Sequence, residues 1–227
     1  NGITMNSRKW RILGAPFDLG SDHEGSADAP GAIREAGLSR IVRYLNDQGV
    51  EVEDIADVEM PDHERSDRKP TGYDEMIEYA PLLMKRLDGM LSNGSIPLVI
   101  GGDHSISIPT VTAAADFLRR SRISESDLGI IWIDAHPDIE TPGEESTNDL
   151  HAMPAAHLLG YGLSELKNLR DFSPKVKPEN LVYIGLRDVV PEELQIIRER
   201  NIAAYTMSDI ERLGIVKVCE EAFECIR

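Results

Sequence analysis

Short apolar runs alternate with longer amphipathic segments along the whole 227-residue chain. Several of the short runs are apolar on both faces, which is typical of parallel strands covered by helices on each side. Strands are predicted within residues 10–17, 50–60, 96–105, 127–136, 180–188 and, as a short one, 202–214. Helices are predicted over residues 31–49, 73–94, 108–122, 151–162, 191–201 and 216–227. The pattern therefore predicts an α/β fold with a mainly parallel sheet.

Side chains that bind metals follow several of the predicted strands. His104 comes after the apolar run 96–101, and Asp134, His136 and Asp138 alternate directly after the run 130–133. In open α/β sheets, ligands bind at the carboxyl ends of the strands, so we expect these residues to meet at one edge. Carboxylate and imidazole groups together suit manganese or another first-row metal, and several carboxylates suit a two-metal site. A polar turn with incidental Asp and His residues is the alternative interpretation.

Composition narrows the class of protein. The formal net charge is −16 and the isoelectric point is about 4.7, which disfavours a nucleic-acid partner and favours cationic small molecules. The chain carries no apolar run long enough to span a membrane and no signal-peptide pattern, so no membrane partner is expected. The two cysteines, Cys219 and Cys225, match neither a redox nor a zinc spacing and are interpreted as reduced thiols. A cytoplasmic location is expected.

Four motifs resemble those of the ureohydrolase superfamily, and most closely its arginases. They are "GGDHS", "DAHPDIETP", "STNDLHAMP" and "LVYIGLRDV", in that order along the chain. The resemblance implies a three-layer α/β/α fold and two Mn²⁺ ions per subunit. It also implies hydrolysis of the guanidinium group of L-arginine to urea and L-ornithine by a metal-bridging hydroxide. A homo-oligomer, a trimer or a hexamer, is expected by the same resemblance.

The resemblance assigns roles to individual residues. By motif position, His104, Asp134, His136 and Asp138 match four metal ligands of the family. Asp138 is also expected to accept a hydrogen bond from the nucleophile. His151, in "LHAMP", matches the histidine that shuttles a proton to the leaving amine, and an ordinary imidazole pKa near 6.5 suits that role.

The family carries its remaining metal ligands in an S-x-D-x-D-x-x-D-P strand, which would be expected just after Arg227. We therefore expect residues 5–227 to form a single ureohydrolase domain that is truncated at its C-terminus. Without that strand, four ligands remain for two metals, and a chain that lacks it is expected to be catalytically impaired. A non-catalytic homologue that binds a partner or builds an oligomer thus stays open as an alternative.

Departures from the arginase pattern cluster where the family contacts the amino-acid end of arginine. Glu140 stands in place of Asn, Thr147 and Asp149 lie in place of an S-G-N motif, and Val190 replaces Asp, whereas Glu193 matches. Glu140, Thr147, Asp149 and Glu193 are the predicted substrate-binding residues. Added carboxylates would repel an α-carboxylate and suit agmatine, which lacks one. Agmatine, guanidinobutyrate and formiminoglutamate are alternative substrates, and plain solvation of the loop is another explanation of the acidic residues.

Overall fold

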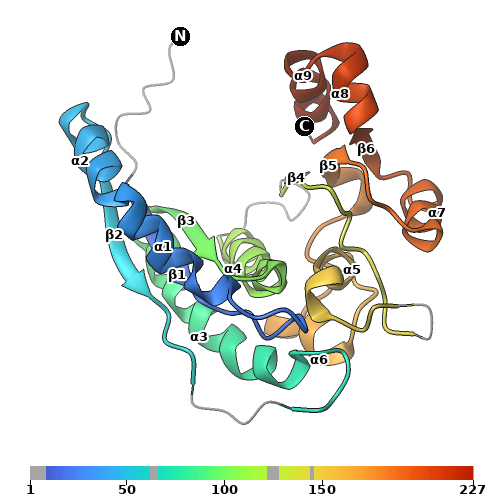
Figure 1. Cartoon of the computed structure of the whole chain (residues 1–227), viewed down its shortest axis with the longest axis horizontal. Helices are drawn as coiled ribbons and strands as arrows, with labels where there is room; N and C mark the ends of the chain where they lie inside the picture. Colours follow the sequence, from blue (N-terminus) through green and yellow to red (C-terminus); the bar gives the residue numbers. More distant parts are fainter. Residues whose placement is uncertain (1–8, 62–65, 122–127, 144–145, 227) are drawn as a thin grey trace. The chain divides into compact units, whose positions relative to one another are not determined.

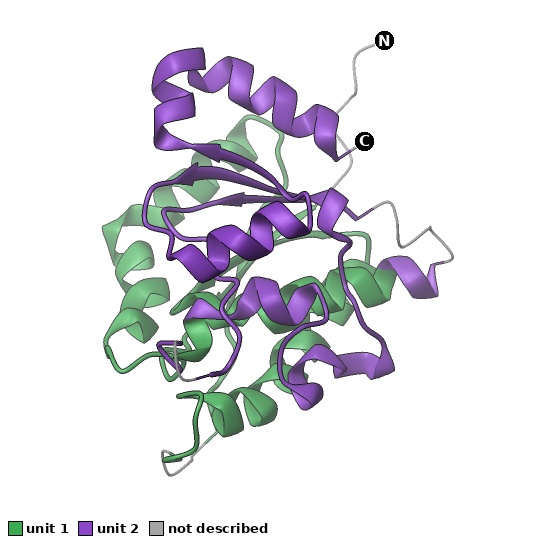
Figure 2. Ribbon diagram, turned by 90° about the vertical axis from the view of Figure 1, so that its right-hand side faces the viewer, with its two compact units in different colours: residues 1–117, 149–151 green, residues 118–148, 152–227 purple. Residues whose placement is uncertain are grey.

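The computed structural model describes residues 9–61, 66–121, 128–143 and 146–226. They form two compact units, which Figure 2 colours separately. Unit 1 lies within residues 1–117 and 149–151, and unit 2 within residues 118–148 and 152–227. Residues 5–8, 62–65, 122–127, 144–145 and 227 of the expected domain lie outside the described residues, and the single-domain organisation stays a prediction.

Unit 1 is built on a three-stranded parallel sheet in the order β2-β1-β3 (Figure 1). Its helices pack on the strands, with α2 against β2 and both α1 and α3 against β3. The strands are β1 (Trp10–Ala15), β2 (Val52–Asp57) and β3 (Ile96–Gly101), and the helices are α1 (Ala29–Ile33), α2 (Ser39–Asp47), α3 (Tyr73–Ser92) and α4 (Ser107–Arg120), whose last turn is assigned to unit 2.

The core of unit 1 comes from α3 and the central strand β1. Tyr79 and Leu83 on α3 are fully buried, as is Leu13 on β1. Phe17, just after β1, stacks on Tyr79 with ring centroids 5.3 Å apart. Apolar positions of α3 recur at helical spacing and supply the apolar area whose burial holds this helix in place.

The expected single helix over residues 31–49 is interrupted. Residues Arg34–Leu38 form a wider, π-type turn between α1 and α2, and Gly37 has a φ of 118°. A backbone angle of this sign is accessible to glycine and rarely to other residues, so the helix breaks at this position. The apolar spacing continues through the break, which is why the sequence pattern predicts one helix rather than two.

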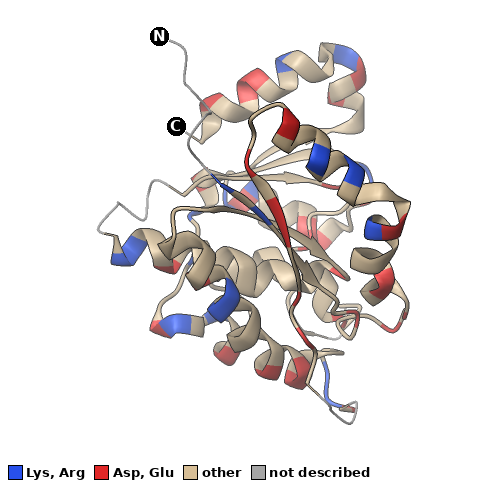
Figure 3. Cartoon of the chain, turned by 90° about the vertical axis from the view of Figure 1, so that its left-hand side faces the viewer, with Lys and Arg blue, Asp and Glu red and all other residues tan. Residues whose placement is uncertain are grey.

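Ion pairs tie the broken helical segment and β1 to β2, where Figure 3 shows a run of acidic positions. Arg11 on β1 pairs with Glu53 on β2. Arg34 donates to both oxygens of Asp54, at 2.7 and 2.9 Å, and to Asp57 at 2.6 Å. The hydrogen bonds from Arg34 lower the pKa of Asp54 below its ordinary value. The stabilisation that the Arg34–Asp54 pair provides is fully present above the ordinary carboxyl pKa. It is lost as the pH falls through the lowered pKa of Asp54.

Unit 2 contains a second three-stranded parallel sheet, in the order β4-β5-β6. The central strand β5 is buried along its whole length, because β4 and β6 flank it and α8 and α9 pack on it. The strands are β4 (Ile130–Ile133), β5 (Leu181–Leu186) and β6 (Ala203–Thr206), and the helices are α5 (Pro154–Leu158), α6 (Ser164–Lys167), α7 (Pro191–Glu199), α8 (Met207–Leu213) and α9 (Ile215–Cys225).

Two helix predictions beyond residue 149 need correction. The helix expected over 151–162 is reduced to a 3₁₀ turn, Leu150–Ala152, followed by α5, because Gly160 takes a φ of 90° and ends the segment. Residues 202–214 hold a helix as well as a strand. Thr206 begins α8 by exchanging hydrogen bonds with Asp209, an N-terminal capping arrangement that the sequence carries as T-x-x-D.

The expected α/β class is confirmed, because both units consist of parallel strands with helices packed on them. Within the part of the chain that the structure describes, no helix combines the length and the apolar character needed to cross a lipid bilayer.

A buried lysine fastens the loop between α6 and β5. The Nζ atom of Lys175, which is 3% exposed, donates to the carbonyl oxygens of Lys167 at 2.9 Å, Leu169 at 2.8 Å and Phe172. Replacement of Lys175 by Met would leave these carbonyls without their donor and is expected to lower the free energy of unfolding by about 2 kcal/mol. Urea denaturation measures the change, and Lys177→Met, at an exposed position, is the control. Equal stability of both variants would contradict the role of the ammonium group.

Candidate active site

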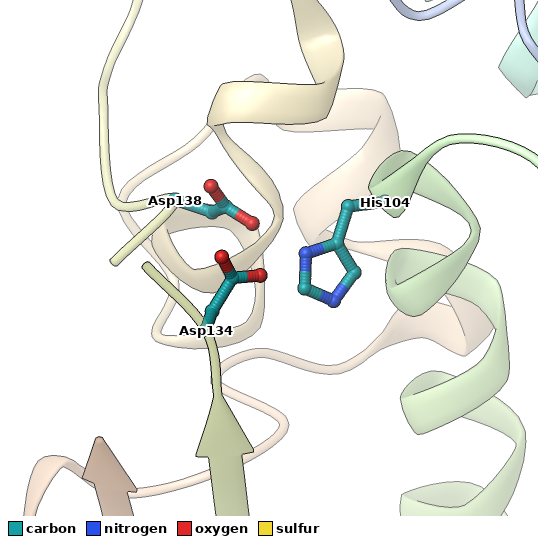
Figure 4. Close-up of side chains that lie close together, drawn as sticks. All are labelled: His104, Asp134 and Asp138. Carbon is teal, nitrogen blue, oxygen red and sulfur yellow. The ribbon is translucent and has the colours of Figure 1, made fainter. Parts of the chain in front are cut away.

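Two carboxylates face one another just past the end of β4. Figure 4 shows the side chains of Asp134 and Asp138 pointing toward the same point, and their ligand atoms lie within 4.8 Å of each other. The Asp134 N–H donates to the carbonyl of Ile184 at 3.1 Å, which extends the pairing of β4 with β5. Asp138 has a φ of 48°, and its carbonyl accepts the N–H of Ala155 at 2.9 Å. The backbone thus holds both residues, and the turn directs their carboxylates together.

His136 points elsewhere. Its Nε2 atom lies 3.3 Å from Oδ2 of Asp188, which follows β5, and its Nδ1 atom lies 3.6 Å from Oδ1 of Asp134. The alternation of side chains that the sequence suggests requires an extended strand, but β4 ends at Ile133 and the turn begins at once. The imidazole is exposed and lies beside the ends of two strands, and its role as a ligand stays a prediction.

In unit 1, His104 begins a 3₁₀ turn that leads from β3 into α4. Asp103 caps this turn by accepting the N–H of Ser105 at 2.9 Å, and it also accepts the N–H of Gly20 at 2.8 Å. Burial raises the pKa of Asp103, and the hydrogen bonds from Ser105 and Gly20 oppose that shift. A Cβ at Gly102 would lie 2.0 Å from the carbonyl oxygen of Phe17, so only glycine fits there. Asp103 therefore shapes the turn that presents His104, as a hydrogen-bond partner rather than a ligand.

His151, which also belongs to unit 1, is anchored by the loop that contains Gly20. Its backbone N–H donates to the carbonyl of Gly20 at 2.9 Å, and its Nδ1 atom lies 3.1 Å from that oxygen. A carbonyl oxygen only accepts, so this geometry assigns the proton to Nδ1 and leaves Nε2 to exchange a proton. The sequence pattern does not single out Gly20, because a contact through a backbone carbonyl leaves no signature in residue type.

The predicted substrate-binding residues are divided between the units. Asp149 forms a bridge with Thr71 in unit 1. Glu140 and Thr147 lie in unit 2, where three donors meet the Oε2 atom of Glu140: the hydroxyl of Ser146 at 2.8 Å and both the N–H and the hydroxyl of Thr147 at 2.9 Å. Nothing in the sequence pattern distinguishes Ser146 as a residue of the site. Glu140 therefore closes its own loop with one of its carboxylate oxygens.

Glu193 connects this loop to α7. Its two oxygens accept the N–H groups of Ile139 at 3.4 Å and Val190 at 3.2 Å. Burial, helped by the nearby charges of Glu140 and Asp138, raises the pKa of Glu193 to about 7 against the opposing effect of its two hydrogen bonds. Glu193 lines a pocket of about 190 Å³ together with the residues Glu140, Thr141, Pro142, Gly143, Ser146, Val190, Glu192 and Ile196. An acidic pocket thus lies beside the turn that carries Asp138.

Comparison with known proteins identifies the family. Residues 8–227 match the arginase family. An arginase of Brevibacillus brevis is 36% identical over 95% of this chain and 70% of its own length. The structure of an arginase from Bacillus caldovelox superposes with a TM-score of 0.85 at 34% identity, covering 96% of this chain and 71% of that one. A formimidoylglutamase structure from Bacillus subtilis, at 20% identity and a TM-score of 0.72, covers 97% of this chain and 62% of its own and shows the shared fold alone.

The matches confirm the three-layer α/β/α fold and the resemblance of the four sequence motifs to ureohydrolases. The family depends on metal ions, and the facing carboxylates of Asp134 and Asp138 are a group of the type that binds them. This chain belongs to the arginase family and is a hydrolase that acts on linear amidines.

Proposed function

We propose that this protein is a binuclear manganese hydrolase that cleaves the guanidinium group of a small cationic substrate and releases urea. The observation that carries the proposal is the facing pair of carboxylates, Asp134 and Asp138, at the carboxyl end of β4. Because the relatives are arginases, L-arginine is the first substrate to test, with L-ornithine as the second product. We propose that the two units together make up one ureohydrolase domain, which acts as a homo-oligomer.

The chemistry of the donor set fits the metal. Two carboxylates and imidazole groups are suited to Mn²⁺, and two carboxylates offset part of the charge of two ions. We assign Asp134 and Asp138 as ligands, with His104 and His136 supplying nitrogen donors. Bound manganese would supply Lewis-acid activation of a water molecule and polarisation of the substrate.

The remaining steps fall to residues of the chain. Asp138 accepts a hydrogen bond from the attacking nucleophile while its backbone is held by Ala155. His151, whose Nδ1–H is directed to Gly20, keeps Nε2 available to deliver a proton to the departing amine. The chain as a whole carries a net charge of −16, which favours a cationic substrate over an anionic one.

Removal and return of the metal tests the proposal. The protein loaded with Mn²⁺ is expected to release urea from a guanidino compound, to lose this activity on chelation, and to regain it when Mn²⁺ is restored. Inductively coupled plasma mass spectrometry measures the metal content of each preparation. Two bound manganese ions without urea from any small guanidino compound would overturn the proposed reaction. A protein that binds no manganese would overturn the proposed metal site.

A further inference from the structure

Backbone hydrogen bonds hold the chain to β5 only for the first residues beyond β4. The Asp134 N–H donates to the carbonyl of Ile184 at 3.1 Å, and the carbonyl of Ala135 accepts the N–H of Arg187 at 2.9 Å. Pro137 follows two residues later and has no N–H, so this pairing cannot continue through it. The turn beyond Pro137 therefore has to be connected to β5 by a side chain.

A tyrosine on β5 makes that connection. The hydroxyl of Tyr183 donates to the carbonyl of Pro137 at 2.8 Å. Tyr183 is fully buried, and its ring packs edge-on against Trp132 of β4, with ring centroids 6.4 Å apart and an interplanar angle of 71°. Because the neighbouring strand holds the ring, the hydroxyl is fixed in place, and so is the carbonyl that it binds.

The carbonyl of Pro137 belongs to the peptide group that leads into Asp138. The orientation of this peptide group sets the φ angle of Asp138, which is 48°, in a region that is unfavourable for residues with a side chain. The carbonyl of Asp138 itself accepts the N–H of Ala155, so the chain is held on both sides of this residue. With this backbone, the buried carboxylate of Asp138 faces that of Asp134 (Figure 4).

We propose that Tyr183 is a positioning residue of the metal site, whose hydroxyl holds the peptide group before Asp138 in the orientation that directs the Asp138 carboxylate toward Asp134. The inference rests on the proposed manganese site and adds to it a residue that touches neither metal nor substrate. Without the hydroxyl, the buried carbonyl of Pro137 loses its donor, and the turn shifts to satisfy it elsewhere. Loss of a group that orients a metal ligand typically weakens metal binding by about tenfold or more.

Tyr183→Phe removes the hydroxyl and keeps the ring that packs on Trp132. On the full chain, this variant is expected to bind Mn²⁺ about tenfold or more weakly than the unchanged protein. Electron paramagnetic resonance measures free Mn²⁺ during the titration. An affinity equal to that of the unchanged protein would overturn the proposal.

Tyr79→Phe is the matched control for this substitution. Tyr79 is also fully buried, and its hydroxyl lies 3.5 Å from the carbonyl of Val58, but it belongs to unit 1, whereas Asp134 and Asp138 belong to unit 2. The control should bind Mn²⁺ like the unchanged protein. An equal loss of affinity in both variants would assign the effect to general destabilisation and would also overturn the proposal.

A second replacement at the same position separates the hydrogen bond from the packing of the ring. Tyr183→4-aminophenylalanine puts an amino group in place of the hydroxyl, so a donor to the Pro137 carbonyl is retained. This variant is expected to recover most of the affinity that Tyr183→Phe loses, and it keeps the test open if Tyr183→Phe does not fold. A folded variant that binds Mn²⁺ no better than Tyr183→Phe would overturn the proposal.

The orientation of the turn can be measured without any metal. Nuclear magnetic resonance couplings between the amide and α protons report the φ angle of Asp138, which should change in metal-free Tyr183→Phe and not in Tyr79→Phe. An unchanged angle in Tyr183→Phe would overturn the proposal whether or not the protein binds manganese. If the angle changes but the unchanged protein binds no Mn²⁺, the proposed metal site fails and the positioning of Asp138 by Tyr183 holds.

Discussion

Replacement of Asp138 by Asn is expected to abolish manganese binding and to lower urea release by about a thousandfold, equivalent to about 4 kcal/mol of transition-state stabilisation. The amide keeps the size of the side chain but removes one of the two facing charges, so the pair no longer offsets the charge of the metal. The left-handed backbone at this position, with a φ of 48°, is one that Asn adopts as readily as Asp. Metal content and urea release are the measurements.

The chain supplies a matched control for this substitution. Asp171 also has a left-handed backbone, with a φ of 60°, and it is exposed and is not part of the carboxylate pair. Asp171→Asn should therefore fold, bind manganese and release urea like the unchanged protein. Full metal content in Asp138→Asn, with the control behaving as expected, would contradict the assignment of Asp138 as a ligand.

Acid should destabilise unit 2 through one buried histidine. His157 is 1% exposed, its Nδ1 lies 2.9 Å from the carbonyl of Met153, and its Nε2 accepts the N–H of Leu163 at 3.1 Å. Burial lowers the pKa of His157 to about 4. Between the ordinary pKa near 6.5 and this value, the unfolded chain binds a proton that the folded chain does not. The free energy of unfolding should therefore fall by about 3 kcal/mol as the pH drops through this window.

His157→Gln removes the titrating group and should flatten the dependence of stability on pH between about 6.5 and 4. The side-chain amide of Gln can both donate and accept, so it can retain part of the pairing with Met153 and Leu163. Urea denaturation at several pH values gives the slope, and His23→Gln, at an exposed histidine, is the control. A slope that persists in His157→Gln would assign the acid sensitivity to other groups.

The parts of the fold that the sequence predicts well are those where burial follows from local pattern. The run Leu181–Leu186 is apolar on both faces because it is the central strand of its sheet. The helix breaks are less predictable. Gly37 sits in an amphipathic pattern that continues on both sides of it, and its backbone angle, with a φ of 118°, breaks the helix. A single glycine in a sequence does not reveal which angle it will adopt.

The candidate site also combines features that the sequence predicts with features that it does not. Asp134, His136 and Asp138 are predicted together as metal ligands, because they alternate directly after an apolar run. The orientation of His136 toward Asp188 is not predicted, since it depends on the position at which β4 ends. The three bonds that Glu140 accepts are likewise hidden, because a carboxylate in a loop is indistinguishable by sequence from one that faces solvent.

Glu193 joins two parts of the site that would otherwise vary separately. It accepts one N–H from Ile139, beside Asp138, and one from Val190 at the start of α7. A substitution that reshapes the pocket through α7 therefore also changes the support of the turn that carries Asp138. Mutations on the two sides should be epistatic, so that an evolutionary or engineered change of substrate would proceed through compensating pairs rather than through single steps.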